Sequence, residues 1–407
     1  MTHSVPSDWA VRPVRDLVSY VASGPSPTCE ERNIHGDREW GLLKTTAVTW
    51  DGWEPRAHKL LPREYWGNHG LEVRTQDVVV TKAGPRHRVG VVAHVDRSPA
   101  RLIVSGKMVL LRPDPKRVVP KVLAGLLSLP APQRYLDERT TGMAESQVNF
   151  ANGALLSCPL AVPALREQQR IAEMLDTLDE RILWQSRVVE KLKLRQAGLV
   201  EKLLAEVIAV ESRLGSHLAH SPRNGYSPKE TDEWTGVQAL GLGCLTTTGF
   251  SPRQLKHVPR QAGRNAAALL SEGDLLMSRA NTRDLVGLAG IYRDVGTPCI
   301  YPDLIMRLTP KPDCRAKFLE LALRSANVRR QIQAISQGTS ESMVKINGAS
   351  VQGLLVRIPE PREQDRIVAV VDALRQEIRH HEEERHKASL LKRGVMEDLL
   401  TGRRRVS

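Results

Sequence analysis

The feature that most constrains this chain is a long internal repeat. Residues 162–171 read VPALREQQRI and match residues 358–367, which read IPEPREQDRI, at an offset of 196 positions. Further upstream, an offset of 197 aligns residues 52–63 with residues 249–260, where Gly, an aromatic residue, Pro, Arg, Lys, Pro and Arg recur at identical spacing. Four more pairs match at the offset of 196: Gly142 with Gly338, Glu145 with Glu341, Ser146 with Ser342, and Val148 with Val344. The chain is therefore a tandem duplication of a unit of roughly 200 residues.

The second part of each unit is expected to be one helix of about 40 residues. Positions spaced by four and three residues, from 171 to 203, are mainly apolar, and those from 367 to 399 are apolar at both ends and polar between. Such a heptad stripe has to be buried. We expect the two helices to pack on each other as an antiparallel coiled coil about a pseudo-two-fold axis, although burial against another protein would also satisfy them.

The ends of these helices carry local signals. Pro163 and Pro359 lie near the starts, where a missing N–H costs nothing, and Gly215 and Gly402 are expected just past the ends. The first part of each unit has short apolar runs bounded by Gly, Pro, Asp and Asn, which are typical of strands. The predicted strands are residues 77–80, 89–92, 108–111, 275–277 and 304–308, with short helices near residues 119–129 and 315–326.

We therefore predict an α+β fold with two tandem domains of mixed α/β structure and two long helices. The predicted boundaries are an N-terminal extension without a counterpart (1–38), a first domain (39–162), a first helix (163–214), a second domain (215–358), and a second helix with a basic tail (359–407). The formal net charge of +13 lies almost wholly in the two domains, which carry +5 in residues 1–162 and +7 in residues 215–358. Two basic segments separated by neutral ones suggest two contacts with a polyanion, or else a scattered solubilising charge.

Several chemistries are not indicated by the sequence. It has no phosphate-binding GxxxxGK[ST] motif, no Asn/Asp-Pro-Pro-aromatic motif of adenine methyltransferases and no CxxC pair among its five cysteines. We expect free thiols, no metal site and no catalytic residue, so the chain is predicted not to be an enzyme. The longest apolar stretch, residues 122–129, is too short to cross a membrane, and no export signal is visible, which indicates a cytoplasmic location without membrane contact.

The arrangement of a variable domain, a long helix opened by Pro-x-x-x-Glu-Gln-x-x-Ile, and a repeat of both resembles the specificity (S) subunit of type I restriction-modification enzymes. The residues that carry the resemblance are Pro163, Glu167, Gln168, Ile171 and Asp176, repeated as Pro359, Glu363, Gln364, Ile367 and Asp372, with residues 198–204 and 394–400 at the helix ends. Residues 273–281 and 285–289 also look like that family's target recognition domain. The resemblance covers about residues 39–402.

The resemblance implies that each target recognition domain reads one half of a bipartite site in double-stranded DNA, and that the helices act as a spacer. It further implies two copies of a methyltransferase subunit that uses S-adenosylmethionine for adenine methylation, and a possible restriction subunit that uses ATP and Mg, in a bacterial or archaeal cell. This chain itself would bind no cofactor. The competing interpretation is a coiled-coil adaptor whose basic domains bind RNA or an acidic protein, and an unrecognised nuclease is a minor alternative.

Candidate DNA contacts are basic residues at matched positions and residues in adjacent Gly/Asn-rich turns. They are Arg56, Lys59, Arg63, Lys82, Arg86, Arg88, Arg253, Lys256, Arg260, Arg279, Asn281 and Arg283. An equally weighted interpretation is that the matched positions recur because the fold needs them. Lys256 is expected to contact phosphate and Asn281 to read a base. By resemblance, partner docking is expected at Glu167, Gln168, Arg170, Glu363, Gln364 and Arg366.

Overall fold

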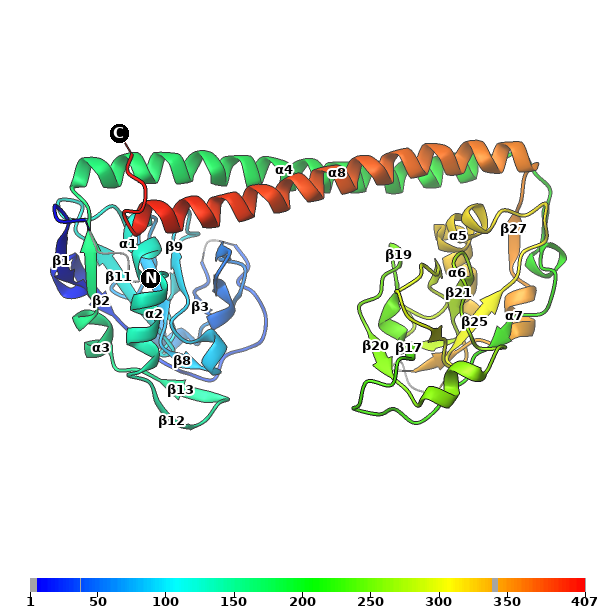
Figure 1. Cartoon of the computed structure of the whole chain (residues 1–407), viewed down its shortest axis with the longest axis horizontal. Helices are drawn as coiled ribbons and strands as arrows, with labels where there is room; N and C mark the ends of the chain where they lie inside the picture. Colours follow the sequence, from blue (N-terminus) through cyan, green and yellow to red (C-terminus); the bar gives the residue numbers. More distant parts are fainter. Residues whose placement is uncertain (1–5, 37, 339–342, 407) are drawn as a thin grey trace. The chain divides into compact units, whose positions relative to one another are not determined.

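A computed structural model describes residues 6–36, 38–338 and 343–406 of the chain. The chain divides into two compact units, one formed by residues 1–185 with 384–407 and the other by residues 186–383 (Figure 1). The two long helices, α4 (Leu165–Ala205) and α8 (Pro361–Leu400), each contribute one half to each unit. Each unit is therefore a mixed α/β domain together with parts of both long helices. The first unit contains the first half of α4 and the second half of α8, and the second unit contains the second half of α4 and the first half of α8.

The first unit is built on an antiparallel sheet with strand order β2 (Val18–Ala22), β11 (Met108–Pro113), β7 (Val78–Thr81) and β9 (Val92–His94). Side chains alternate between its two faces. Val78 and Val80 join the core with helix α1 (Pro120–Leu127), whereas Val79 packs in a second core on the opposite face. There it meets a smaller sheet of β10 (Leu102–Ile103), β3 (Gly41–Leu43) and β6 (His58–Leu60).

The second unit repeats this plan. Its main sheet has the order β16 (Arg223–Asn224), β25 (Ile305–Leu308), β21 (Leu275–Ser278) and β23 (Ala289–Ile291), and α5 (Ala316–Arg324) takes the place of α1. Its smaller sheet consists of β20 (Leu255–His257), β17 (Gln238–Leu240) and β24 (Cys299–Ile300). The same strand pairings in both units confirm that the duplication extends to the fold.

The remaining elements are short. The helices are α2 (Pro130–Asp137), α3 (Asn152–Ser157), α6 (Ala326–Ile335) and α7 (Gly348–Gln352). The strands are β4 (Val48–Thr49), β5 (Gly52–Trp53), β8 (Ala83–Gly84), β12 (Thr141–Ala144), β13 (Gln147–Asn149), β18 (Leu245–Thr246), β19 (Gly249–Phe250), β22 (Ala280–Asn281) and β26 (Val344–Lys345). Of the predicted strands, four are confirmed, and the run at residues 89–92 starts its strand three residues later, at Val92. The predicted short helices are α1 and α5.

The expectation that residues 1–38 form an extension without a counterpart is wrong for their described part. Strand β1 (Ala10–Pro13) pairs with β14 (Pro159–Val162), just as β15 (Glu211–Arg213) pairs with β27 (Leu355–Arg357). Gly24 and Gly225 also correspond, because a Cβ on either would lie 1.7 or 1.9 Å from a backbone carbonyl oxygen, of Val104 or Tyr301. The sequence did not reveal this part of the repeat, because the two copies share backbone pairing there but few identical side chains. Residues 1–5 and 37 of this segment lie outside the described residues, as do Glu341 and Ser342 of the repeat.

The two helices have the predicted length, with 41 residues in α4 and 40 in α8. Within the first unit, Asp179 of α4 lies 2.5 Å from Lys392 of α8, and Arg181 lies 3.6 Å from Glu384. Residue numbers that rise along α4 fall along α8, so the pairing is antiparallel, as predicted. The second unit shows the same direction, with Lys193 of α4 2.6 Å from Glu382 of α8.

The apolar ends of the helical seam are buried. Ile171, Leu175, Ile367 and Val371 are each at most 1% exposed, within the domain cores, and Val189, Leu192 and Ile378 form a further buried cluster in the second unit. Gly402 has a φ of +71°, two residues after α8 ends, which suits the predicted glycine cap. Gly215 does not cap its helix, because α4 already ends ten residues earlier. Within the described ranges, no helix combines the length and the apolar character that a membrane span requires.

Candidate functional site

One glutamine holds each long helix to its own domain, Gln168 on α4 and Gln364 on α8. Gln168 is 1% exposed; its Oε1 accepts from the backbone N–H of Val119 at 2.7 Å, and its Nε2 donates to the carbonyls of Pro163 (2.9 Å) and Arg117 (3.2 Å). Gln364, with no exposed surface, makes the equivalent three bonds in the second unit. The prediction that these two side chains dock a partner is therefore wrong. They satisfy backbone groups where the domain meets its helix.

Of the other predicted docking residues, Glu167 is buried and the rest are at least partly exposed. Glu167 is 8% exposed and accepts hydrogen bonds from the indole of Trp9 and the guanidinium of Arg405. Its counterpart Glu363 instead pairs with Arg366 one helical turn away, at 2.7 Å. Arg170 is exposed on α4. Of the predicted set, Arg170, Glu363 and Arg366 are therefore the side chains that an approaching partner could reach.

A second pair of contacts fixes each helix on its domain. Lys121 of α1 forms ion pairs with Asp176 and Asp179 of α4, and Lys317 of α5 pairs with Asp372 of α8 at 2.8 Å. Burial disfavours the charge on Lys121, but the two carboxylates raise its pKa above the ordinary value. The recurrence of Asp176 and Asp372 in the sequence repeat therefore reflects a helix–domain contact.

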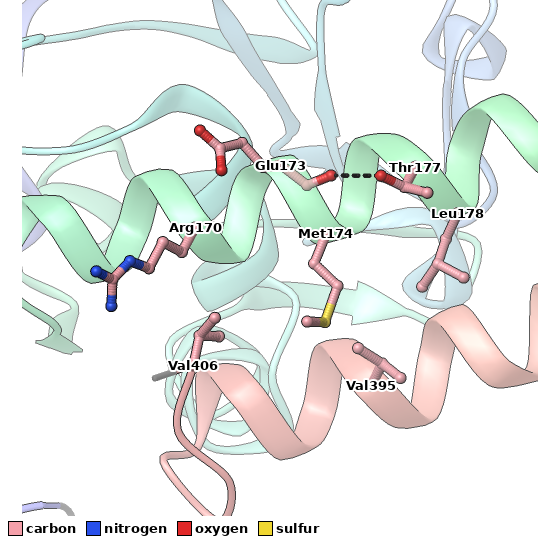
Figure 2. Close-up of a pocket in the computed structure, with 7 residues that line it drawn as sticks. All are labelled: Arg170, Glu173, Met174, Thr177, Leu178, Val395 and Val406. Atoms are coloured by element: carbon pink, nitrogen blue, oxygen red, sulfur yellow. Dashed lines mark hydrogen bonds between the residues drawn. The ribbon is translucent and has the colours of Figure 1, made fainter.

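A groove of about 570 Å³ runs beside α4 and α8 in the first unit (Figure 2). Its lining is Arg170, Glu173, Met174, Thr177, Leu178, Val395 and Val406. Met174 is 42% exposed, which is high for a methionine on a helix that is packed on both a domain and another helix. An apolar floor bordered by one basic and one acidic side chain suits a partner protein better than a small polar ligand.

Four of the predicted DNA contacts are exposed and available. The side chains of Arg56, Arg253 and Arg260 have no hydrogen-bond or ion-pair partner among the residues that the structure describes, and Arg63 stacks on Trp66 with its guanidinium carbon 5.6 Å from the ring centre. These arginines form two matched pairs, Arg56 with Arg253 and Arg63 with Arg260, and each pair has one member in each unit. They could donate to DNA phosphates without giving up an internal ion pair.

The matched lysines are not free in the same way. Lys59 lies 2.8 Å from Glu31, and Lys256 lies 2.5 Å from Glu230. Both glutamates come from the segment before the first strand of the smaller sheet, so the ion pair is itself duplicated. Hydrogen bonds from Lys44 and Lys59 lower the pKa of Glu31 to about 2, which keeps this carboxylate charged at neutral pH. Phosphate contact by either lysine would compete with its glutamate.

Other predicted contacts hold the fold together. Arg88 donates to the carbonyls of Thr45 and Val48 at 2.7 and 2.9 Å, and Arg283 donates to the carbonyl of Gln333 at 3.2 Å. For Lys82, the hydrogen-bond partners are Ser23 and Asn152, both at 3.1 Å; for Arg86, the ion-pair partners are Asp137 and Glu145. Burial lowers the pKa of Lys82. These geometries favour the interpretation that the fold retains such positions.

The last two predicted contacts lie together in the second unit. Arg279 and Asn281 are half-buried around strand β22, where Asn281 pairs with Val344. The Asn281 Oδ1 accepts from the backbone N–H of Thr282 at 2.9 Å. Its amide nitrogen has no partner among the described residues, so it keeps donors that could reach a base acceptor.

Sequence reasoning missed two exposed tryptophans. Trp50 lies in the turn between β4 and β5, and Trp234 packs edge-on against His257 with ring centres 5.3 Å apart; each is 56% exposed. The position that matches Trp50 in the second unit is Thr247. Candidate contacts were mainly chosen where both copies have similar residues, so Trp50 was not selected. Exposed aromatic rings can stack on nucleic-acid bases that are unpaired and accessible.

The described residues include no group of three or more His, Cys, Asp or Glu side chains arranged to hold a metal ion. All five cysteines are free thiols. Burial raises the pKa of Cys158 to about 11 and that of Cys299 and Cys314 to about 12, so these three stay protonated at neutral pH.

Comparison with known proteins agrees with this architecture. No protein-family model matches the chain. The specificity subunit of the type I restriction enzyme EcoEI from Escherichia coli is 29% identical over 172 residues, which are 42% of this chain but only 29% of that protein. Two relatives match along most of both chains. The EcoKI specificity subunit of Escherichia coli strain K12 is 21% identical over 91% of this chain and 82% of its own length, and the MjaVIII specificity subunit of Methanocaldococcus jannaschii is 22% identical over 99% and 94%.

Solved structures share the fold. A chain from a structure of the assembly and conformational transition of a type I R-M system superposes with a TM-score of 0.57 at 16% identity, covering 98% of this chain and 99% of that one. The S subunit from M. genitalium superposes with a TM-score of 0.52 at 13% identity, covering 98% of both chains. By sequence along nearly its whole length and by fold, the chain is a relative of the specificity (S) subunits of type I restriction-modification enzymes.

Proposed function

We propose that this chain is the sequence-specific DNA-binding specificity subunit of a type I restriction-modification complex. Each domain would read one half of a bipartite site in double-stranded DNA, and the bound complex would direct adenine methylation or restriction by partner subunits. The predicted target recognition domains are residues 39–162 and 215–358. Each would be extended by a strand that precedes it in the sequence and pairs with it, β1 in the first unit and β15 in the second.

The observation that carries the proposal is the duplication of a complete structural unit together with its helix anchor. The three hydrogen bonds of Gln168 recur at Gln364, and the Lys121–Asp176 ion pair recurs as Lys317–Asp372. A domain fixed in this way on a helix keeps its orientation relative to that helix. Rigidly held recognition domains are what a reader of two half-sites at constant spacing requires.

The charges support DNA as the ligand. Arg56 and Arg63 in the first unit and Arg253 and Arg260 in the second are exposed at matched positions and would contact phosphates in both half-sites. Phosphate contacts position a protein without choosing a sequence, so they are expected to recur in both copies. Base-reading residues are expected to differ between copies, as Asn281 differs from Gly84 and Trp50 from Thr247.

A methyltransferase subunit is the partner that we propose for the groove in the first unit. At the positions of Met174, Leu178 and Val395, the second unit has Val370 and Leu374 on α8 and Leu199 on α4, all of them apolar, of which Leu374 is buried. Two related apolar surfaces suit two copies of one partner. S-adenosylmethionine would bind to that partner, and ATP and Mg to a restriction subunit where one is present.

The proposal is tested by mapping methylated adenine across the genome of the source cell, with and without this gene. Loss of methylation at one split motif on deletion is the expected result, and it would give both half-sites and the spacer length. A complementing variant that lacks charge at both Arg56 and Arg253 would restore less methylation at the same motif. An unchanged map in a cell whose methyltransferase subunit is expressed and active contradicts the proposal.

A further inference from the structure

Each unit carries a short hairpin at the same place in its fold. In the first unit it is β4–β5 and in the second it is β18–β19, and both pairs are antiparallel in the same register. Gly52 and Gly249 match at an offset of 197, and both have a positive φ, of +133° and +110°. The two hairpins therefore share one backbone frame. They differ at the tip, where Trp50 in the first unit matches Thr247 in the second.

The tip of the second hairpin is tied to its domain. The guanidinium of Arg324, on α5, donates to the carbonyl of Thr247 at 2.7 Å. A Cβ on Gly249 would lie 2.9 Å from a carboxylate oxygen of Glu320, which is also on α5. This turn is therefore held closely against the helix.

The tip of the first hairpin has no such tie among the residues that the structure describes. The shorter side chains of Ala124 and Ser128 stand on and next to α1 at the positions of the two long side chains of α5. A Cβ on Gly52 would meet no atom within 4 Å. The indole of Trp50 is 56% exposed and makes no hydrogen bond or ring contact within the described part of the chain. A large aromatic side chain is therefore presented to the solvent where the second unit has a threonine.

The base of the first hairpin is nevertheless rigid. Arg88 donates to two backbone carbonyls there, one of them that of Val48 at 2.9 Å, and Val48 has no exposed surface. The indole N–H of Trp53 donates to the carbonyl of Arg97 at 2.9 Å. An aromatic ring on a rigid support loses little conformational freedom when it binds. The hairpin therefore presents Trp50 from a fixed position.

These supports are particular to the first unit. The matched positions of the second unit have different residues, namely Leu285 for Arg88, Phe250 for Trp53 and Asp294 for Arg97. The side chain of Arg97 is exposed without a partner among the described residues, as is that of Arg56, three residues after the hairpin. In sites that bind unpaired bases, cations hold the phosphates and an aromatic ring stacks on the base. The first hairpin and its adjoining segments have this composition.

We infer that Trp50 stacks on a DNA base in the half-site read by the first unit, namely the partner base left unpaired when the target adenine leaves the helix. The inference rests on the proposed function, because methylation of an adenine within a duplex requires that base to leave the stack. The unpaired partner exposes a ring face, which the indole covers, while Arg56 and Arg97 contact the adjoining phosphates. The second unit has Thr247 at this place, so its half-site is methylated without this stacking.

The experiment uses the complex of the full chain with the methyltransferase subunit encoded in the same genome, S-adenosylmethionine, and duplexes that carry the split motif. Each half-site is assayed alone, on duplexes whose other half-site is already methylated. Trp50→Ala is expected to slow methylation of one half-site roughly tenfold or more and to leave the other at the wild-type rate. Trp50→Phe, which keeps an aromatic ring, should retain most of the rate.

A duplex with an abasic position opposite the target adenine separates stacking from any other role of Trp50. This duplex lacks the base on which the indole would stack, so the wild type and Trp50→Ala should methylate it at the same rate. Thr247→Ala changes the tip of the other hairpin and is the matched control. It should leave the half-site that depends on Trp50 at the wild-type rate.

Three results would overturn the inference. They are wild-type rates at both half-sites for Trp50→Ala, equal losses at both half-sites, and a loss that persists on the abasic duplex. Native mass spectrometry provides a readout besides activity. If Trp50→Ala bound fewer copies of the methyltransferase subunit than the wild type, Trp50 would contact the partner protein and the inference would be wrong. A wild-type complex that methylates neither half-site would instead refute the proposed function.

Discussion

Gln168 and Gln364 lie 196 residues apart and make the same three hydrogen bonds in their respective units. Each accepts from the backbone N–H at the start of a short helix at 2.7 Å and donates to the carbonyl of the proline five residues before it, at 2.9 Å for Gln168 and 2.7 Å for Gln364. The glutamine is retained in both copies because its amide oxygen accepts from one backbone N–H while its amide nitrogen donates to two backbone carbonyls. The most recognisable motif of the sequence is therefore structural, and it sets the geometry on which DNA reading depends.

Replacing this glutamine should destabilise only its own unit. Gln168→Ala leaves a backbone donor and two acceptors unpaired, and we expect it to cost about 2–3 kcal/mol of unfolding free energy. Hydrogen exchange followed by mass spectrometry should show faster exchange in residues 117–127, with the matching region 313–323 unchanged. Gln364→Ala should show the reverse pattern. Gln169→Ala, an exposed neighbour, is the control; if it exchanged as fast as Gln168→Ala, the anchor would not be specific.

The turn before β7 should be stabilised by glycine. Gln76 has a φ of +75°, and the matched position in the second unit is Gly273 with a φ of +92°. A non-glycine residue in this region costs about 1–2 kcal/mol, partly offset by the greater freedom of glycine in the unfolded chain. Gln76→Gly is expected to raise stability by about 0.5–1 kcal/mol in urea denaturation.

The converse change provides the control. A Cβ at Gly273 would meet no atom within 4 Å, so Gly273→Ala should be destabilising through the backbone alone, by about 1 kcal/mol. A stabilising effect of Gly273→Ala, or a destabilising effect of Gln76→Gly, would contradict this account.

Acid should loosen the helix pair in the first unit through Asp179. Burial disfavours its charge, but Lys392 and Lys121 lower the pKa of Asp179 below the ordinary value. A carboxylate whose pKa is lower in the folded state contributes stability above its unfolded pKa near 4, and this contribution is lost as the pH falls toward the folded pKa. Thermal melting between pH 3 and pH 7 should therefore show a smaller loss on acidification for Asp179→Asn than for the wild type.

Asp51→Asn is the control for this measurement, because Asp51 lies exposed at a hairpin turn with no side-chain partner among the described residues. It should leave the slope of stability against pH unchanged. A double-mutant cycle with Lys392→Ala should give a coupling of about 0.5–1 kcal/mol, since the side chains of Asp179 and Lys392 are 36% and 27% exposed and water screens the pair. An Asp179→Asn variant with the full wild-type acid sensitivity would disprove the assignment.

Glu230 and DNA phosphates should compete for the ammonium group of Lys256, and DNA affinity should report this competition. The ammonium lies 2.5 Å from the Glu230 carboxylate, so phosphate contact requires that pair to open. Lys256→Ala is expected to weaken binding to all duplex sequences and to reduce the slope of log affinity against log salt by about 1. Glu230→Gln removes the competing carboxylate and should raise affinity, because Lys256 then starts unpaired.

Binding titrations at several salt concentrations, on specific and unrelated duplexes, check both variants. Arg315→Ala is a suitable control, since this arginine pairs with Asp365 at 3.0 Å next to the helix anchor and belongs to neither predicted contact set. If Lys256→Ala and Glu230→Gln moved the salt slope in the same direction, the phosphate assignment for Lys256 would be wrong.

The architecture could be predicted from the sequence because the decisive signals are local or repeated. The match of residues 162–171 with 358–367 required a duplication, and the heptad spacing required two long helices with buried seams; Ile171 and Ile367 are both fully buried. Charge could be assigned to segments by counting. By contrast, the cap expected at Gly215 was wrong, because α4 ends at Ala205 and the chain beyond it packs on the second unit without helical structure, with Val207 in its core.

The site residues could only be sorted once the tertiary structure brought distant segments together. Arg56 and Lys59 look alike in sequence, yet Lys59 meets Glu31 while Arg56 points to solvent without a partner in the described part of the chain. Gln168 resembles a surface motif until its bonds to backbone groups about 50 residues earlier are known. Whether a polar side chain is available for DNA or a partner depends on which segments fold against it.

The sequence by itself thus determined the duplication, the two helices, the α+β character of the domains and the location of the positive charge. Tertiary structure decided that residues 10–22 complete the first domain, and that Arg405 reaches Glu167 across 238 residues of chain. The physical reason is that periodicity and composition record whether a residue is buried, whereas the identity of its partner is set by long-range strand pairing and helix packing. Those contacts leave no pattern within the short windows from which a sequence can be interpreted.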